Sequence, residues 1–218
     1  VAAFHSGNQT TAMPELLVCD GFNEGVPCVL GGVIPGVGGL PGPTDNSLAA
    51  PAPETGMILR FDNATSKWRD PAGFDWPPNV FFSLPDRDVF AVNANTLSAG
   101  NIYSHVGTIL FNLAVNPVSG KVYVSNTEAP NQVLFEGPGN HGGSTVQGHL
   151  SEARITVLSG ASSVAPRHLN KHIDYSKLHT DVPDLVDVSQ KDHSLATPLE
   201  MVVSSDGSTL YVAAFGSA

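Results

Sequence analysis

Two segments of the sequence align without a gap, LAVNPVSGKVYVSN at 113–126 and MVVSSDGSTLYVAA at 201–214. In both, an apolar strand pattern leads into turn-forming residues and then into an apolar-Tyr-Val pattern, so that Tyr123 matches Tyr211. The offset is 201 − 113 = 88 residues. Repetition at this scale is typical of stacked supersecondary units, and propeller blades have about 40 to 50 residues each. The offset therefore predicts two similar blades with a divergent one between them.

The rest of the chain also favours short strands. Charged residues make up only 14 % of the chain, while it contains 22 Gly and 17 Pro, a composition that favours many tight turns over helices. The residues of MILRFD, 57–62, alternate as in a strand, and 67–70 supply a short return strand. A hairpin is predicted at 112–126, with its turn at 117–120. Further strands are expected at 132–136 and 153–158.

The run DVFAVNANTLSAGNIYSHVGTILFNLAVNPVSGKVYVSNTEAPNQVLFEG resembles the YVTN-type β-propeller repeat. The matching elements are 89–93, Val106-Gly107, 113–116 and 123–126, although Asn93 stands where Asp is more usual and the second copy, 211–214, lacks the final Asn. The resemblance implies an all-β fold of four-stranded antiparallel blades, about three to four in this chain. It also implies a protein of the large bacterial exported kind, working outside the cytoplasm as a periplasmic, cell-surface or secreted protein.

The pattern divides the chain in two. Residues 1–55 show little periodicity and include a Gly/Pro-rich stretch at 31–53, so they are expected to form an irregular N-terminal arm. Residues 56–218 are expected to form the blades, with inserts at 137–152 and 159–197. Since a propeller closes by packing its last blade on its first, we expect these blades to belong to a larger propeller or assembly.

Charge and cysteine content narrow the classes of partner. Ten Lys and Arg against twenty Asp and Glu give a net charge of −10, which argues against a nucleic-acid partner. No apolar run reaches membrane-spanning length. Cys19 and Cys28 are nine residues apart, and we expect them to form a small disulfide loop in an oxidising compartment. The alternative is a pair of metal ligands.

Two groups of residues are candidate metal ligands. His168 and His172, in HLNKH, are four residues apart, a spacing that puts two imidazoles on one face of a helix and can bind zinc if a third ligand converges. Asp86 and Asp88, in DRD, could give oxygens to calcium, although carboxylates at such a place more often bind the amides of a turn. The sequence has no C-x-x-C-H motif, so no covalent haem is expected in this chain.

A Gly-rich insert carries the residues expected to face a partner, namely His141, Gly142, Gly143 and His149. Three functions remain open from the sequence. The first is a binding module or scaffold that presents loops to a protein partner, such as a redox or cell-envelope protein. The second is part of an extracytoplasmic oxidoreductase or lyase that uses the His-rich inserts or a haem segment further along the protein. The third is a structural subunit of a surface layer or filament.

Overall fold

The computed structural model describes residues 1–13, 57–70, 75–76, 80, 82–129, 151–173 and 193–217. These residues form an all-β structure of four small antiparallel sheets, and none of the sheets closes on itself. The strand expected at 132–136 and most of the Gly/Pro-rich arm lie outside the described residues. Within the described part of the chain, no helix is long and apolar enough to cross a membrane.

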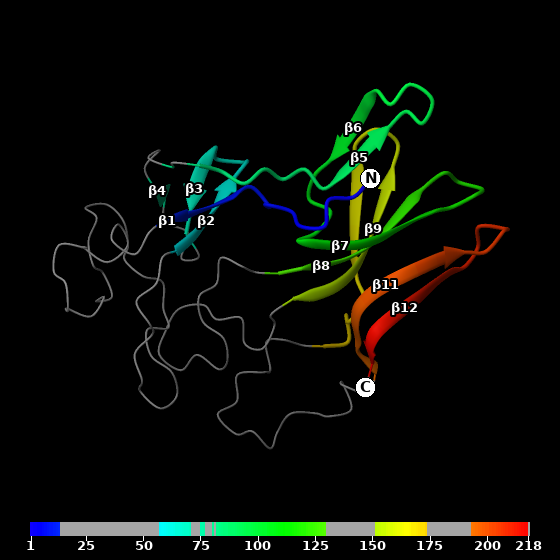
Figure 1. Ribbon diagram of the computed structural model, residues 1–218. Coiled ribbons are helices and arrows are strands. Elements are labelled where there is room, and N and C mark those ends of the chain that lie inside the picture. Colours follow the sequence, from blue (N-terminus) through cyan, green and yellow to red (C-terminus); the bar gives the residue numbers. More distant parts are fainter. Residues whose placement is uncertain are drawn as a thin grey trace, which may run out of the picture.

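A central four-stranded sheet has the order β10-β9-β8-β7 (Figure 1). Its strands are β7 (Ile109–Val115), β8 (Val122–Glu128), β9 (Glu152–Ser159) and β10 (Ser163–His168). Each strand pairs antiparallel with the one before it, so the chain crosses the sheet in sequence order. The hairpin predicted at 112–126 is present as β7 and β8, somewhat longer than expected. β10 lies within the insert predicted at 159–197. A strand forms there because Val164 packs against the core of the central sheet.

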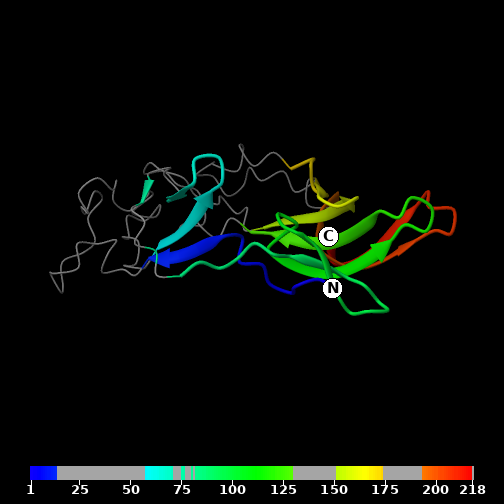
Figure 2. The ribbon, with the colours of Figure 1, turned by 90° about the horizontal axis from the view of Figure 1, so that it is seen from above.

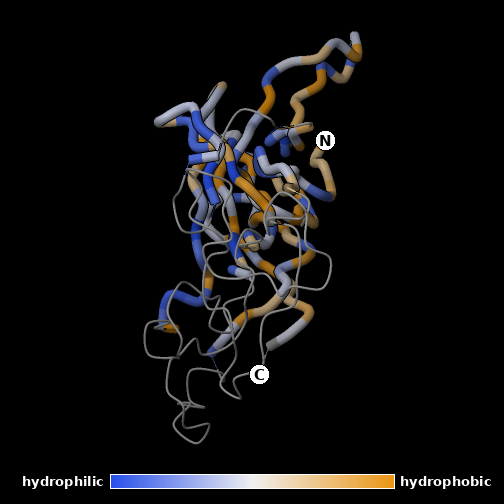
Figure 3. The backbone as a smooth tube through the Cα atoms, turned by 90° about the vertical axis from the view of Figure 1, so that its left-hand side faces the viewer, coloured by the Kyte–Doolittle hydropathy of each residue, from blue (hydrophilic) through white to orange (hydrophobic). Residues whose placement is uncertain are grey.

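A two-stranded hairpin packs on each face of the central sheet. The hairpin of β5 (Val89–Val92) and β6 (Ala99–Tyr103) covers one face, and that of β11 (Leu195–Val203) and β12 (Leu210–Ser217) covers the other. Because side chains alternate along a strand, β7, β8 and β9 each contribute to both contacts. Several apolar stretches lie in the middle of the molecule, and others lie on the segments that project from it (Figure 3). The first core contains Val89, Val106, Leu110, Val124 and Leu158, and the second Ala114, Ile155 and Met201.

The two hairpins that align in sequence also share their register. Val115 pairs with Val122 and Leu113 with Val124, and 88 residues later Val203 pairs with Leu210 and Met201 with Val212. Both ladders shift register at the same place, after Leu110 in β7 and after Pro198 in β11. The sequence analysis predicted a divergent blade between these two hairpins. That prediction is wrong, because Met201 of β11 packs directly against Ala114 and Ile155 of the central sheet. The offset is long because 129–151 separate β8 from β9 within the central sheet and 169–194 separate β10 from β11 of the next sheet.

Three turns of the same design connect these strands. In each, the first residue donates its N–H to the carbonyl five residues on, as in Asn93 to Ser98, Asn116 to Lys121 and Ser204 to Thr209. The Asn93 and Asn116 side chains accept N–H groups within their own turns, which explains why Asn begins both. The residue four positions after each Asn has a positive φ, +68° at Gly120 and 56° at Leu97.

The fourth sheet contains β1 (Thr10–Met13), β2 (Met57–Asp62), β3 (Lys67–Arg69) and β4 (Asp75–Trp76), paired in that order. It lies to one side of the other three sheets in both views (Figures 1 and 2). β1 begins within the arm predicted at 1–55. Residues 1–6 of that arm also run along sheet edges, with Ala2 bridged to Val89 and His5 to Ile109. The N-terminal end is therefore paired backbone, because its VAAF pattern suits a strand.

Candidate functional site

The carboxylates of Asp86 and Asp88 hold the turn at 104–107, between β6 and β7. Asp86 accepts the His105 N–H at 2.9 Å through Oδ1, and its Oδ2 lies 2.5 Å from His105 Nδ1. Asp88 accepts the N–H of Val106 at 2.7 Å and that of Gly107 at 3.4 Å through Oδ2. Both carboxylates thus bind turn amides, the alternative that the sequence analysis set against calcium.

Asp88 is the strongly perturbed acid of this turn. Its side chain is fully buried, and burial raises the pKa of the carboxyl to about 6. The nearby Asp86 carboxylate raises the pKa further, whereas hydrogen bonds from the Ser6 hydroxyl and the Val106 N–H lower it. Asp88 therefore changes its charge in mildly acidic solution.

A polar network joins this turn to the central sheet. The Asn126 side chain donates to Thr156 Oγ1 at 2.9 Å, and Thr156 and Arg154 both donate to the carbonyl of Val106, at 2.8 and 2.9 Å. Asn126 and Thr156 are fully buried, so each of these bonds replaces water that the site excludes. Asn126 is the last residue of the Tyr-Val-x-Asn motif, and its position explains why an amide is needed there.

His105 projects from this turn into solvent. Its side chain is 60 % exposed, and its backbone has a φ of 61°, which is uncommon for a residue other than glycine. Because Asp86 lies against Nδ1, Nε2 is the nitrogen left to meet a ligand. Strained backbone of this kind is often found at functional sites.

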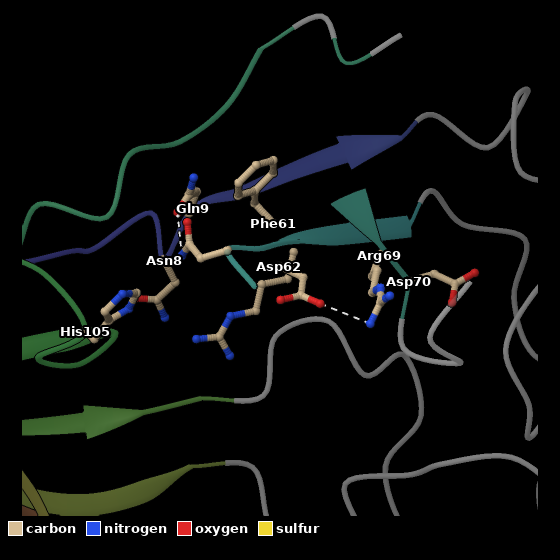
Figure 4. A pocket seen from close by; sticks show the side chains of 9 residues that line it. Asn8, Gln9, Phe61, Asp62, Arg69, Asp70 and His105 are labelled. Carbon is tan, nitrogen blue, oxygen red and sulfur yellow. Dashed lines mark hydrogen bonds and ion pairs between the residues drawn. The ribbon is translucent and has the colours of Figure 1, made fainter. Parts of the chain in front are cut away.

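A polar concavity of about 360 Å³ opens beside His105, between the turn and the fourth sheet. Figure 4 shows His105 next to Asn8, with Gln9 further along the same segment and the Asp62–Arg69 ion pair, 3.0 Å long, across the concavity. The lining also includes Arg60 from β2. Asp62 and Asp70 in the lining balance the charges of the two Arg side chains, so the surface offers hydrogen bonds to a small polar group. The sequence analysis missed His105, whose only signal was its place before Val-Gly.

Neither pair of candidate metal ligands, His168 with His172 or Asp86 with Asp88, gains a third ligand in the part of the chain that the structure describes. His168 is the last residue of β10, so the helical spacing expected between it and His172 does not exist. The His172 ring lies 3.2 Å from the Ser194 hydroxyl and edge-on to His193, with ring centroids 6.5 Å apart. Among the described residues, no three His, Cys, Asp or Glu side chains are grouped as metal ligands. Six other candidates lie outside the described residues: Cys19, Cys28, His141, Gly142, Gly143 and His149.

The outer face of the β11–β12 hairpin is open and apolar. Val202, Tyr211 and Phe215 are 62, 60 and 83 % exposed. Subtracting 88 from these numbers gives Ala114, Tyr123 and Thr127 of the central sheet. Ala114 and Tyr123 belong to the core formed with β11 and β12. The open face is thus the counterpart of a face that is covered elsewhere in the same chain.

Comparisons with protein-family models, curated proteins and solved structures find no match to this chain. The likeness to the YVTN-type repeat accordingly rests on the residues that carry it. We therefore base the function on the geometry of the sheets and their open surfaces.

Proposed function

We propose that this chain is part of an extracytoplasmic β-propeller scaffold that binds a protein partner through the outer face of the β11–β12 hairpin. One observation carries the proposal. Tyr123 and Tyr211 have the same place in two hairpins of equal register, yet Tyr123 packs against the next hairpin while Tyr211 is 60 % exposed.

The chemistry of this face supports protein binding. Exposed aromatic side chains next to β-branched residues contribute strongly when a partner excludes water from them. Val202, Tyr211 and Phe215 form such a group, and a scattered exposed residue such as Leu97 does not. The matching face of the central sheet is covered by a β-hairpin, so the expected partner presents a β-sheet.

One property of the sequence supports the compartment. Cys19 and Cys28 are spaced for a small loop that an oxidising compartment would close. The net charge of −10 disfavours a nucleic-acid partner. Propeller scaffolds with inserts between strands use those inserts for recognition. His141 and His149 are in such an insert and are proposed to extend the same binding surface.

A photoreactive amino acid at position 215 tests the proposal in cells that export the chain. We expect it to cross-link to one defined protein, identified by mass spectrometry, whereas the same group at position 97 gives no specific product. Replacing Tyr211 and Phe215 together by Ser should then weaken the binding of that purified partner at least tenfold. Equal cross-linking from both positions, or binding unchanged by the double substitution, would refute the proposed function.

A further inference from the structure

The first six residues of the chain nearly repeat its end. VAAFHS at 1–6 and VAAFGS at 212–217 differ only at His5 and Gly216. The second copy forms most of β12, and the first copy runs along the edge of β5. The same short sequence therefore occurs twice, once paired with β5 and once on the open edge of β12.

The first copy shows which strand such a sequence binds. Val1 and Phe90 exchange two backbone hydrogen bonds, of 2.9 and 2.8 Å, and the Ala3 N–H donates to the Asp88 carbonyl at 2.7 Å. Ala2 is bridged to Val89 between them. The pairing is antiparallel, and it reaches only the first half of β5. Val1 and Phe4 of this segment are 76 and 62 % exposed.

β12 offers the same groups on its open edge. Among the described residues β12 pairs only with β11. The Ser204 N–H donates to the Thr209 carbonyl, so the backbone groups of every second residue from Thr209 point toward β11. Those of Val212 and Ala214 therefore point away from β11, as those of their counterparts Val1 and Ala3 point toward β5.

We propose that the open edge of β12 binds β5 of a second copy of this chain, in place of that copy's own Val1–Phe4. The product is a sheet of order β11-β12-β5-β6, which repeats the order β7-β8-β9-β10 of the central sheet. β12 has eight residues and covers the whole of β5, whereas Val1–Ala3 reaches only as far as Phe90. The exchange therefore lengthens the ladder while keeping the same VAAF sequence against β5.

This arrangement also covers the open apolar face. Tyr123 packs in a core with Met201 and Leu210 of the next hairpin. The residues 88 positions before Met201 and Leu210 are Leu113 and Val122, which are half-buried in the central sheet. In the assembly, Tyr211 of one copy packs against Leu113 and Val122 of the next. Exposed apolar surface on one copy thus meets apolar surface on another.

The contact is heterologous, because β12 of one copy meets β5 of the next, so copies add head to tail into a ring or a filament. Leaving aside the sheet of β1 to β4, residues 82–217 of each copy supply one whole four-stranded sheet and two halves to this arrangement. If the rotation between copies closes, the product is a propeller-like ring, and an unclosed chain of copies is a filament.

A directed cross-link tests the register. Since Val1 pairs with Phe90, Val212 pairs with the partner's Phe90 and Tyr211 with the partner's Ala91. Copies carrying Tyr211→Cys are mixed with copies carrying Ala91→Cys, in about 0.15 M salt to screen the net charge of −10. Because Val212 and Phe90 would exchange hydrogen bonds, Tyr211 and Ala91 form a non-hydrogen-bonded pair. The Cα atoms of such a pair lie about 4.5 Å apart, within disulfide range. We expect a disulfide between positions 211 and 91, and none when Leu97→Cys replaces Ala91→Cys.

The oligomeric state supplies the second readout. Light scattering should show a mass that rises with concentration to a multiple of the monomer, and Ala214→Pro should weaken association at least tenfold by removing an outward N–H. Tyr211→Lys does the same without altering the backbone, should Ala214→Pro fail to fold. This inference rests on the proposed function but fails separately. A monomer at all concentrations, or a cross-link from position 215 only to a different protein, overturns the inference, and the latter result leaves the scaffold function standing.

Discussion

Tyr123 and Tyr211 have the same register position in two hairpins, 211 − 123 = 88 residues apart, but among the described residues a neighbouring sheet covers only Tyr123. The Asn116 amide also donates to the Tyr123 hydroxyl at 3.3 Å, and to the carbonyl of Gly207 at 2.9 Å. Tyr123 thus lies where two neighbouring hairpins are joined, and its counterpart Tyr211 lies on an open surface. Their different surroundings predict different consequences of mutation.

Replacing Tyr123 by Ala should destabilise the chain by about 2 kcal/mol, because it removes a half-buried ring from the core with Met201. The matched change, Tyr211→Ala, should alter the free energy of unfolding by less than about 0.5 kcal/mol in dilute solution. Urea unfolding of the two variants measures both values. Equal losses of stability would mean that the two faces are covered alike.

Asp88 should make the folded state less stable as pH rises. Its pKa is raised from 3.8 to about 6 on folding, so the folded chain binds this proton more tightly than the unfolded chain does. This contribution of Asp88 to the free energy of unfolding is present below about pH 4 and is lost as pH rises through about 6, a loss of about 3 kcal/mol.

The exposed carboxyls affect the free energy of unfolding over a different pH range. The pKa values of Asp62 and Asp75 are lowered by hydrogen bonds, from Thr65 and from Lys67 first, and that of Asp206 falls to about 2 through hydrogen bonds led by Ser204. Their contributions are present above about pH 4 and lost below it. Unfolding free energies between pH 4 and 7 therefore separate the effect of Asp88 from that of these three carboxyls. In Asp88→Asn the decline over this range should shrink by at least half, and an unchanged decline would assign it to another group.

Leu97→Gly should stabilise the chain by about 0.5 to 1 kcal/mol. Leu97 has a φ of 56° and is 77 % exposed, so its side chain brings strain without burial. Gly120 has the equivalent position in the next turn, with open space around it. Gly120→Ala should therefore destabilise by about 1 kcal/mol through backbone strain alone. Thermal unfolding of both variants checks this, and shifts of the same sign would contradict the explanation.

Gly107→Ala should cost about 2 to 3 kcal/mol, because a methyl group there would overlap the buried side chain of Asn126. The Asn126 amide is fixed by Thr156 and cannot move aside without losing that bond. Gly100→Ala is the control, since its nearest neighbour, the Ala91 carbonyl oxygen, would be 3.2 Å away. Chemical denaturation of the two variants should separate them clearly, and a neutral Gly107→Ala would show that Asn126 can shift.

Much of the local structure follows from the sequence. The alternation in MILRFD predicts β2, the turn residues at 117–120 predict the hairpin of β7 and β8, and the likeness of 113–126 to 201–214 anticipates two hairpins of equal register. These features depend on neighbouring residues, so a linear pattern contains them. The helix that the spacing of His168 and His172 suggested is wrong. β10 continues to His168, and its pairing with Arg154 overrides any helical preference.

The sequence by itself determined that the chain is all-β, where several of its strands and turns lie, and that two hairpins are alike, because side-chain alternation and turn chemistry act over a few residues. Only the tertiary structure decided that the two hairpins are direct neighbours, that Asp86 and Asp88 hold the turn of His105, and that Tyr211 is open where Tyr123 is covered. These relationships join residues far apart in the chain. They arise from which faces pack together, and a linear pattern does not contain that choice.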